Sequence, residues 1–323
     1  MHTPMDKIVP PLRWLLANAE RRGRAWSYWV VDPLVGLYNT ILHYTMRLLP
    51  IDACSNLGAF LSFYDPFFFR ESDTRARKAW IRLRPEESDP ASVDAAMRRL
   101  WRCISRTMAE YSVIDRFWDD GRISVEGLEH LHAARAANKP ILIAALHLGN
   151  WESGLAAGNR LGFTGSGIYQ PLENRFEMRL AINTRNRYNQ GQVPAFPGPD
   201  VLLTALSELR EKGGPFVIYV DEFIRGRVQA PAFGRPLRAE GNIYYVVRLA
   251  AMTDAAVIPT YCVRLNDSAN FKLQFLPPID LLRTGHHKSD AIVNIDRLNA
   301  VIEPIVRKYL DQWYFLLDIE FDD

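Results

Sequence analysis

The chain has 323 residues, of which 48% are hydrophobic and 24% charged, so it is long enough to bury a sizeable core and is not a disordered protein. Its formal net charge of +2 is much weaker than the basic bias of a dedicated nucleic-acid binder, and we expect no nucleic-acid partner. Three widely spaced cysteines without a CxxC motif predict a reducing compartment and packing roles for Cys54, Cys103 and Cys262.

The first 118 residues are predicted to be helical, with segments near residues 6–24, 28–49, 51–64 and 91–117. No cleavable signal peptide is evident. The stretch from Trp26 to Leu49 is long enough to span a bilayer, but Asp32, Pro33 and further polar residues interrupt it. We therefore expect an interfacial, membrane-associating helix, with a soluble core helix as the alternative. The arginine-rich stretch 70–106 suits an anionic membrane surface, or else forms ordinary solvated helix faces.

Strands and helices alternate after Gly121. Strands are expected at 122–126, 140–146, 166–170, 215–220, 255–263, 271–275 and 313–321, with helices at 128–137, 151–161, 174–189, 199–212, 241–252 and 289–310. This order predicts an α/β domain over residues 119–323, with a mostly parallel, mixed central sheet covered by helices on both faces. We expect it to pack as one unit with the helical N-terminal region, residues 1–118.

The segment PILIAALHLGNWE, residues 140–152, contains the strongest chemical signal. An apolar strand ends at His147, and Asn150 stands where an N-cap would open the next helix. Glu152 follows in that helix. A histidine at a strand end and a nearby carboxylate suit a general base that removes a proton from a hydroxyl, with the carboxylate orienting the imidazole.

Two other interpretations of His147 stay open. A zinc site is one, although the HExxH spacing is absent and no Cys or His cluster completes a ligand set, so we expect no metal. A buried structural histidine is the other. Open α/β sheets place their ligand crevice at the carboxyl ends of strands, which favours a catalytic role.

The segment Ile123 to Glu152 resembles the central block of the bacterial late acyltransferases of lipid A biosynthesis and of their mycobacterial phosphatidylinositol mannoside acyltransferase relatives. These belong to the lysophospholipid acyltransferase superfamily, whose His-x4-Asp/Glu mark corresponds to His147 and Glu152. The resemblance covers roughly residues 122–315. Further blocks follow in family order, at 167–171 with Asn174, 185–188, 216–222, 231–234 and 257–260.

The resemblance implies transfer of an acyl chain from acyl carrier protein or acyl-CoA to a hydroxyl of a lipid or glycolipid, at the cytoplasmic face of the bacterial inner membrane. It implies no cofactor beyond the acyl-thioester. His147 and Glu152 would be catalytic. The substrate-binding candidates are Asn150, Tyr169, Gln170, Asn174, Arg185, Arg187, Asp221, Glu222 and Arg225.

Two features depart from the family pattern. The chain ends in an acidic segment in place of a basic one, and FVIYV is followed by Asp-Glu-Phe rather than aspartate-histidine or aspartate-arginine. Two other functions stay open on the residues alone. One is a lipid or acyl-thioester hydrolase that uses the same His–Glu pair on water, and the other is a non-catalytic lipid-binding protein of the same fold.

Overall fold

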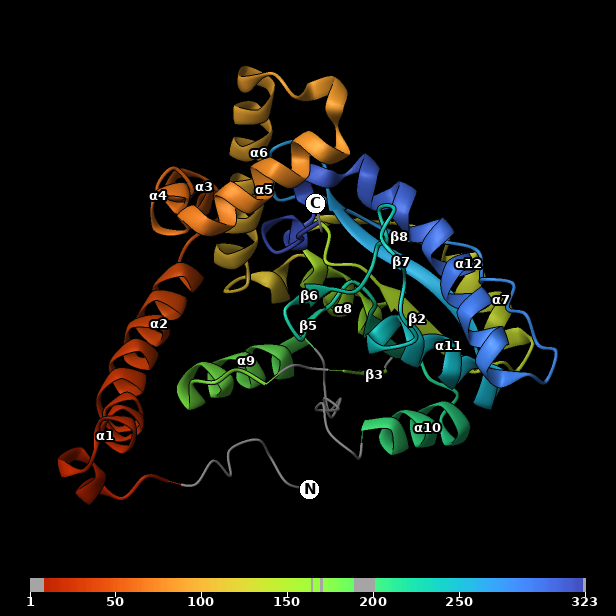
Figure 1. Cartoon of the computed structure of the whole chain (residues 1–323), viewed down its shortest axis with the longest axis horizontal. Coiled ribbons are helices and arrows are strands. Elements are labelled where there is room, and N and C mark those ends of the chain that lie inside the picture. The colour runs from red at the N-terminus through yellow and green to blue at the C-terminus, as the bar shows by residue number, and fades with distance from the viewer. Residues whose placement is uncertain (1–8, 164, 169–170, 189–200, 322–323) are drawn as a thin grey trace.

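The computed structural model describes residues 9–163, 165–168, 171–188 and 201–321 (Figure 1). A six-stranded sheet forms the centre, in the order β1-β8-β7-β2-β4-β3. Every neighbouring pair is parallel except β7 and β8, so the expected mostly parallel, mixed sheet is confirmed. The strands are β1 (Ile123–Glu126), β2 (Ile141–Ala145), β3 (Ser166–Gly167), β4 (Phe216–Tyr219), β7 (Ala256–Arg264) and β8 (Phe271–Phe275).

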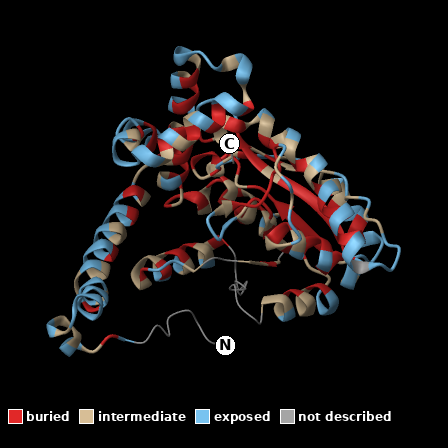
Figure 2. Cartoon of the chain, in the orientation of Figure 1, coloured by how far each residue is buried: buried red, intermediate tan, exposed pale blue. Residues whose placement is uncertain are grey.

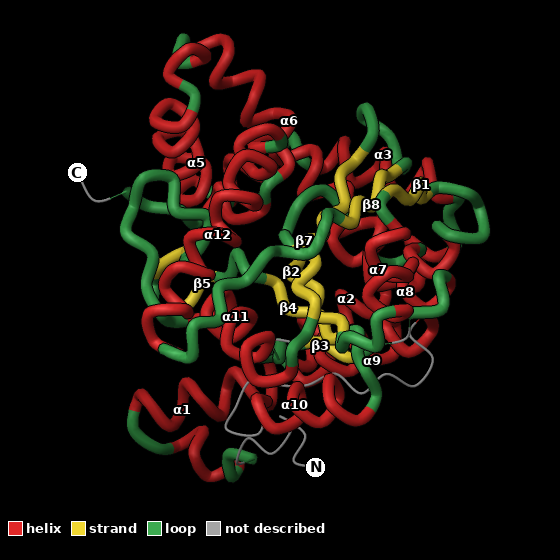
Figure 3. Tube along the Cα trace, turned by 90° about the vertical axis from the view of Figure 1, so that its right-hand side faces the viewer, coloured by secondary structure: helices red, strands yellow, loops and turns green. Residues whose placement is uncertain are grey.

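Helices cover both faces of the sheet, and the strands are the most buried part of the molecule (Figures 2 and 3). Side chains alternate along β2: Ile143 packs on one face, with α7 (Leu128–Ala136) and α8 (Trp151–Arg160). Leu142 packs on the other face, with α10 (Val201–Glu211), α11 (Gly241–Thr253) and α12 (His287–Lys308). Burial on both sides explains why β2 reads as a continuous apolar run rather than an alternating one.

The predicted helical N-terminal region is present. A 3-10 turn (Leu12–Leu16), α1 (Ala19–Trp26), a π-helical turn (Ser27–Val31) and α2 (Asp32–Arg47) extend as an arm from the α/β body, with α9 (Arg175–Tyr188) beside α2 (Figure 1). Pro33 does not break this arm because it lies in the first turn of α2. The remaining helices are α3 (Ile51–Leu61), α4 (Asp65–Phe68), α5 (Arg70–Leu83) and α6 (Pro90–Glu110). The sequence did not predict α5.

The predicted C-terminal strand at 313–321 is wrong. This segment forms a short 3-10 helix at Tyr314–Leu317, directly after another at Leu310–Gln312, and its one bridge joins Trp313 to Leu148. Trp313 is fully buried, so its apolar run marks a core segment, which continuous hydrophobicity alone does not distinguish from a strand. A small hairpin of β5 (Phe223–Ile224) and β6 (Arg227–Val228) was also not predicted.

The N-terminal helices leave many apolar side chains on the surface. Leu34, Leu37, Tyr38 and Ile41 of α2 are all more than half exposed. In the ranges that the structure describes, no helix combines the length and apolarity needed to cross a bilayer. The three cysteines are buried and unbridged, in agreement with their expected packing roles.

Candidate active site

His147 and Asp221 meet at the carboxyl ends of two neighbouring parallel strands. Ala145 of β2 pairs with Tyr219 of β4, so the residues two positions beyond them stand at the same level. Nδ1 of His147 lies 2.8 Å from Oδ1 of Asp221, and Asp221 is fully buried. A carboxylate only accepts hydrogen bonds, so this contact assigns the proton to Nδ1 and leaves the lone pair on Nε2.

Three aromatic rings surround the His147 imidazole. The Tyr219 ring lies 4.2 Å away between centroids, and Trp151 and Phe315 meet the imidazole edge-on at 5.4 and 5.0 Å. The His147 side chain nevertheless keeps 19% of its surface exposed. The ring is therefore held in one orientation while a substrate can still reach it.

Glu152 does not orient the imidazole as the sequence led us to expect. In the described residues the His147 ring hydrogen-bonds Asp221. Glu152 instead accepts hydrogen bonds from Arg185 Nε at 3.3 Å and from the Tyr188 hydroxyl at 2.8 Å. The reason is that Glu152, in the first turn of α8, reaches across to α9, where both partners lie. Burial by itself would raise the pKa of the Glu152 carboxyl, but Arg185 and Tyr188 hold that pKa below its usual range.

Asn150 is the N-cap of α8, as predicted. Its Oδ1 accepts the Ser153 N–H at 3.3 Å, and its Nδ2 donates to Oε2 of Glu110 at 2.8 Å. Asn150 is 1% exposed and both ends of its amide are bonded to protein groups, so the structure assigns it a positioning role.

Glu110 belongs to a buried polar network that joins the N-terminal helices to this loop. It pairs with Arg264 of β7, whose Nη2 lies 2.8 Å from Oε2, and both side chains are almost fully buried. Thr107, one turn earlier on α6, donates to the Gly149 carbonyl at 3.0 Å. The loop from His147 to Asn150 is therefore held from α6 as well as from the sheet.

Two predicted site residues face the N-terminal arm. Asn174 caps α9 by accepting the Phe176 N–H at 2.9 Å, and its Nδ2 donates to the Asp32 carbonyl of α2. Arg187 points toward α2, with Nη1 lying 3.4 Å from Nε2 of His43. Both side chains help to join α9 to α2.

Of the remaining predicted residues, Glu222 lies close enough to His147 for their charges to interact, Arg225 lies at the surface, and two fall outside the described ranges. Glu222 receives the Asn242 N–H at the start of α11. Arg225 is 82% exposed in the turn of the β5–β6 hairpin, where it pairs with Glu240. Tyr169 and Gln170 fall outside the residues that the structure describes.

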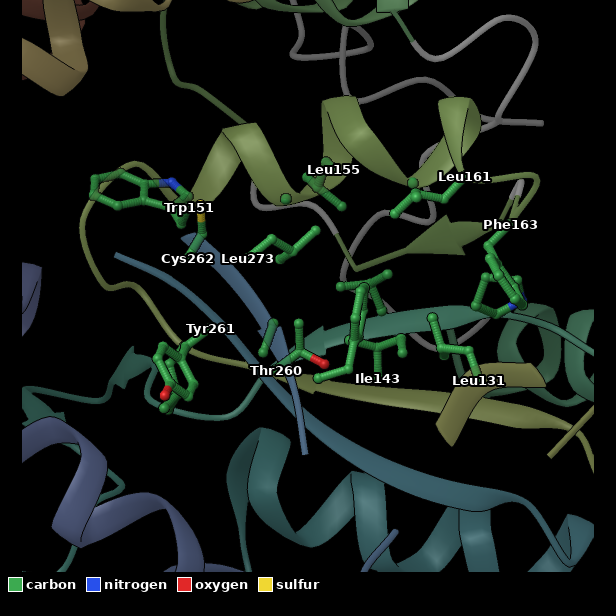
Figure 4. Close-up of a pocket in the computed structure, with 18 of the residues that line it drawn as sticks. Leu131, Ile143, Trp151, Leu155, Leu161, Phe163, Thr260, Tyr261, Cys262 and Leu273 are labelled. Carbon is green, nitrogen blue, oxygen red and sulfur yellow. The ribbon is translucent and has the colours of Figure 1, made fainter. Parts of the chain in front are cut away.

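An apolar cavity lies between α8 and the sheet and reaches the site (Figure 4). Trp151 and Tyr219, which contact the His147 ring, line one part of it, and Leu161 and Phe163 line the part at the other end of α8. Gly154 of α8 also faces the cavity, although glycine weakens a helix by roughly 1 kcal/mol relative to alanine. The missing side chain keeps that space open.

Residues 21–318 match the family model for the bacterial lipid A biosynthesis acyltransferases. The chain belongs to this family. It is 23% identical over 207 residues to the lipid A biosynthesis palmitoleoyltransferase of Escherichia coli (strain K12), and to the same extent to the lipid A biosynthesis acyltransferase of Shigella flexneri. Each alignment covers 62% of this chain and 63% of the relative, just under two thirds of the relative's length.

In this lipid A acyltransferase family member, sequence reasoning missed several residues that build the site. Trp313 donates its indole N–H to Oδ2 of Asp221 at 2.9 Å. Tyr188 bonds Glu152, Glu110 bonds Asn150, and Arg264 pairs with Glu110. The sequence did contain a signal that could have paired Asp221 with His147. The segments PILIAALH and PFVIYVD place His147 and Asp221 almost equally far from the prolines that precede their strands. The other contacts join distant parts of the chain, and no local motif marks them.

Proposed function

We propose that this chain transfers a fatty acyl group from an acyl-thioester to a hydroxyl of a lipid or glycolipid, with His147 as general base. The observation that carries the proposal is the hydrogen bond between Nδ1 of His147 and buried Asp221, beside an apolar cavity. Membership of the lipid A biosynthesis acyltransferase family favours a lipid A precursor as the acceptor. The donor would be acyl carrier protein or acyl-CoA carrying the acyl chain.

In the proposed reaction, Nε2 of His147 takes the proton from the acceptor hydroxyl, and the resulting oxygen attacks the thioester carbonyl carbon. The C–S bond then breaks, and the imidazolium returns its proton to the leaving thiolate. Asp221 stabilises the imidazolium in between. The developing oxyanion needs N–H donors, and the first turn of α8 supplies backbone N–H groups that lack intrahelical acceptors.

The Glu152–Arg185 pair would assist without touching the transferred proton. Glu152 is ionised at neutral pH, and its negative charge is close enough to interact with the positive charge of protonated His147. It therefore favours the imidazolium that forms during transfer. Its bonds to Arg185 and Tyr188 also fix the start of α8 against α9, so the oxyanion donors stay aligned.

We also propose that the N-terminal helices rest on the cytoplasmic face of the bacterial inner membrane through their exposed apolar side chains. The arginine-rich stretch, residues 70–106, offers an anionic membrane less positive charge than its composition indicates, because several of its arginines are paired with carboxylates. Arg75 lies 3.8 Å from Asp318, Arg99 Nε lies 2.6 Å from Asp311, and Arg106 Nε lies 2.9 Å from Asp267. The first two of these pairs neutralise part of the acidic C-terminal segment, which weakens one argument against an anionic acceptor.

The decisive experiment supplies vesicles that contain a lipid A precursor with a radiolabelled acyl-thioester, and then resolves the lipids. Label in the acceptor lipid, lost in His147→Ala, is the expected result. Label in free fatty acid alone would identify a hydrolase, since the partly exposed His147 is also accessible to water. No turnover with retained lipid binding would identify a non-catalytic protein. Equal activity of His147→Ala and the wild type would rule out the mechanism.

A further inference from the structure

A second apolar space lies outside the site described above. It is a groove of about 590 Å³ between the N-terminal helices, α9 and the C-terminal segment, a volume within the range of roughly 300–1,000 Å³ typical of ligand pockets. Apolar side chains from five elements line it: Leu42, Leu61, Met108, Leu180 and Leu317.

The groove reaches the surroundings of His147 through Tyr314. This residue lines the groove, and its backbone N–H donates to the His147 carbonyl at 3.0 Å. Its ring lies 5.2 Å from that of Trp151, which lines the cavity beneath α8. The groove and the cavity therefore both approach the general base, through different aromatic side chains.

The polar side chains in the groove wall are bonded to protein partners. Asp65 accepts the Ser105 hydroxyl, and Nδ1 of His43 lies 3.1 Å from the Ser112 hydroxyl oxygen. Burial, aided by the charges of Arg187 and Arg47, lowers the pKa of His43 to about 4, so its ring is neutral near pH 7. The wall thus favours hydrocarbon over a charged ligand.

The rim of the groove joins exposed apolar surface. Leu42, Leu61 and Met108 are 37%, 43% and 51% exposed. Beside them, the end of α3 and the α4 segment expose a cluster of aromatic residues: Phe60, Phe63, Tyr64, Phe67, Phe68 and Phe69. Exposed apolar patches of this kind mark contact with a membrane or with another protein. A lipid chain could pass from a bilayer on this surface into the groove with little contact with water.

We propose that the groove receives the hydrocarbon chains of the acceptor lipid, and that the cavity beneath α8 receives the chain being transferred. This assignment rests on the proposed function, because a transfer reaction must bring two chain-bearing substrates to one base. The cavity is the narrower space, with a volume of about 70 Å³ against about 590 Å³ for the groove, whose rim is exposed at Leu61 and Met108. An acceptor that resides in a bilayer needs the wide, open site.

The test compares two substitutions of half-exposed methionines on helices. Met108→Trp fills the groove, and Met252→Trp places the same ring on α11, outside it. Vesicles containing a phospholipid with a diazirine on its acyl chain are photolysed with full-length His147→Ala protein, and the adducts are located by mass spectrometry. We expect adducts on α6 and α9 that Met108→Trp reduces roughly tenfold and Met252→Trp does not. Leu180→Trp serves as a second groove variant if Met108→Trp fails to fold.

Kinetics of the active protein provide the second measurement. Met108→Trp should raise KM for the acceptor lipid roughly tenfold and leave both KM for the acyl-thioester and thioester hydrolysis without acceptor unchanged. Adducts confined to residues of the cavity beneath α8, or a changed KM for the thioester alone, would overturn the assignment. If the wild type transfers no acyl group, the proposed function fails, and the crosslinks alone decide whether the groove binds lipid chains.

Discussion

Asp221 binds His147 at two atoms. One carboxylate oxygen lies 2.8 Å from the ring Nδ1, and the other accepts the backbone N–H of the same residue at 2.8 Å. The second oxygen also accepts the indole N–H of Trp313. A carboxylate held in this way fixes both the tautomer and the direction of the imidazole, so its contribution to the reaction depends on its charge and on its geometry.

Asp221→Asn should lower kcat for acyl transfer roughly 100- to 10,000-fold, because an amide NH₂ facing Nδ1 would favour the tautomer with the proton on Nε2. KM should change little. Steady-state kinetics measure both constants. The control is Asp280→Asn, since the Asp280 side chain is fully exposed. A kcat within threefold of the wild type's would mean that His147 does not depend on Asp221.

Glu152→Gln should destabilise the fold by about 1–3 kcal/mol at pH 7, because it replaces the buried ion pair between Glu152 and Arg185 with a bond between a neutral amide and the guanidinium. The pKa of Glu152 in the folded chain lies below its ordinary value of 4.5, so its ionised form contributes stability that is fully present well above pH 4.5 and is lost as the pH falls through the folded pKa. The difference in unfolding free energy between the variant and the wild type should therefore shrink below pH 4.5. Urea unfolding from pH 7 down to the lowest pH at which the wild type stays folded measures this. A difference that is independent of pH would contradict the assignment.

Glu110→Ala should cost about 3–5 kcal/mol of unfolding free energy, because it leaves Arg264 buried and unpaired. Asp119→Ala is the control. It removes the ion-pair partner of Arg160, but the side chains of Asp119 and Arg160 are 57% and 50% exposed, and the loss should stay near 1 kcal/mol or less. Chemical denaturation gives both values. Equal losses of unfolding free energy would mean that the buried Glu110–Arg264 pair stabilises the fold no more than an exposed pair does.

Gly154→Phe should shift the preferred donor toward shorter acyl chains, because the added ring would enter the cavity beneath α8. The nearest atom to a side chain added there is Cδ1 of Leu273, 3.3 Å from the new Cβ. Competition between acyl-thioesters of different lengths measures the preference. Ala133→Phe, on the exposed side of α7, is the control for adding a ring to a helix. An unchanged chain-length profile in Gly154→Phe would exclude this cavity as the acyl-chain site.

Replacing both Leu37 and Ile41 with glutamate should weaken binding to vesicles at least roughly tenfold, because about 1.5–3 kcal/mol per large apolar side chain is lost from the membrane contact. These residues are 57% and 58% exposed on α2. Ile292→Glu on α12, where the native side chain is 56% exposed, is the matched control. Co-sedimentation with vesicles gives the partition coefficient. Equal binding of the control and the double variant would place the membrane contact elsewhere.

The sequence predicted the α/β part well because its strands have strong local signals. β2 and β4 are short apolar runs bounded by prolines and polar residues, and both lie where they were expected. The predictions failed where tertiary contacts decide the conformation. Trp313 and the apolar run after it pack against the site as 3-10 turns, although their composition also fits a strand. α5 was missed because its charged residues obscure a narrow buried stripe that includes Ala76 and Trp80.

The site was predicted only in part, for a related reason. His147, Asp221 and Glu152 were all identified as candidates, but the partner of each was not. Sequence spacing suggested His147 with Glu152, which share a loop and a helix start. The actual partners come together through strand register and helix packing, which pair Asp221 with His147 and Arg185 with Glu152.

The bonds from α6 to the His147 loop limit how far the chain can be shortened for biochemical work. Thr107 and Glu110 hold Gly149 and Asn150, so a fragment that begins at residue 119, where the α/β pattern starts, would lack the partner of buried Arg264. α1 and α2 make no such contact with that loop among the described residues. A shortened version that begins near Pro50 keeps α3 to α6 and their bonds to this loop, but it loses Leu42 and the rest of the α2 wall of the groove.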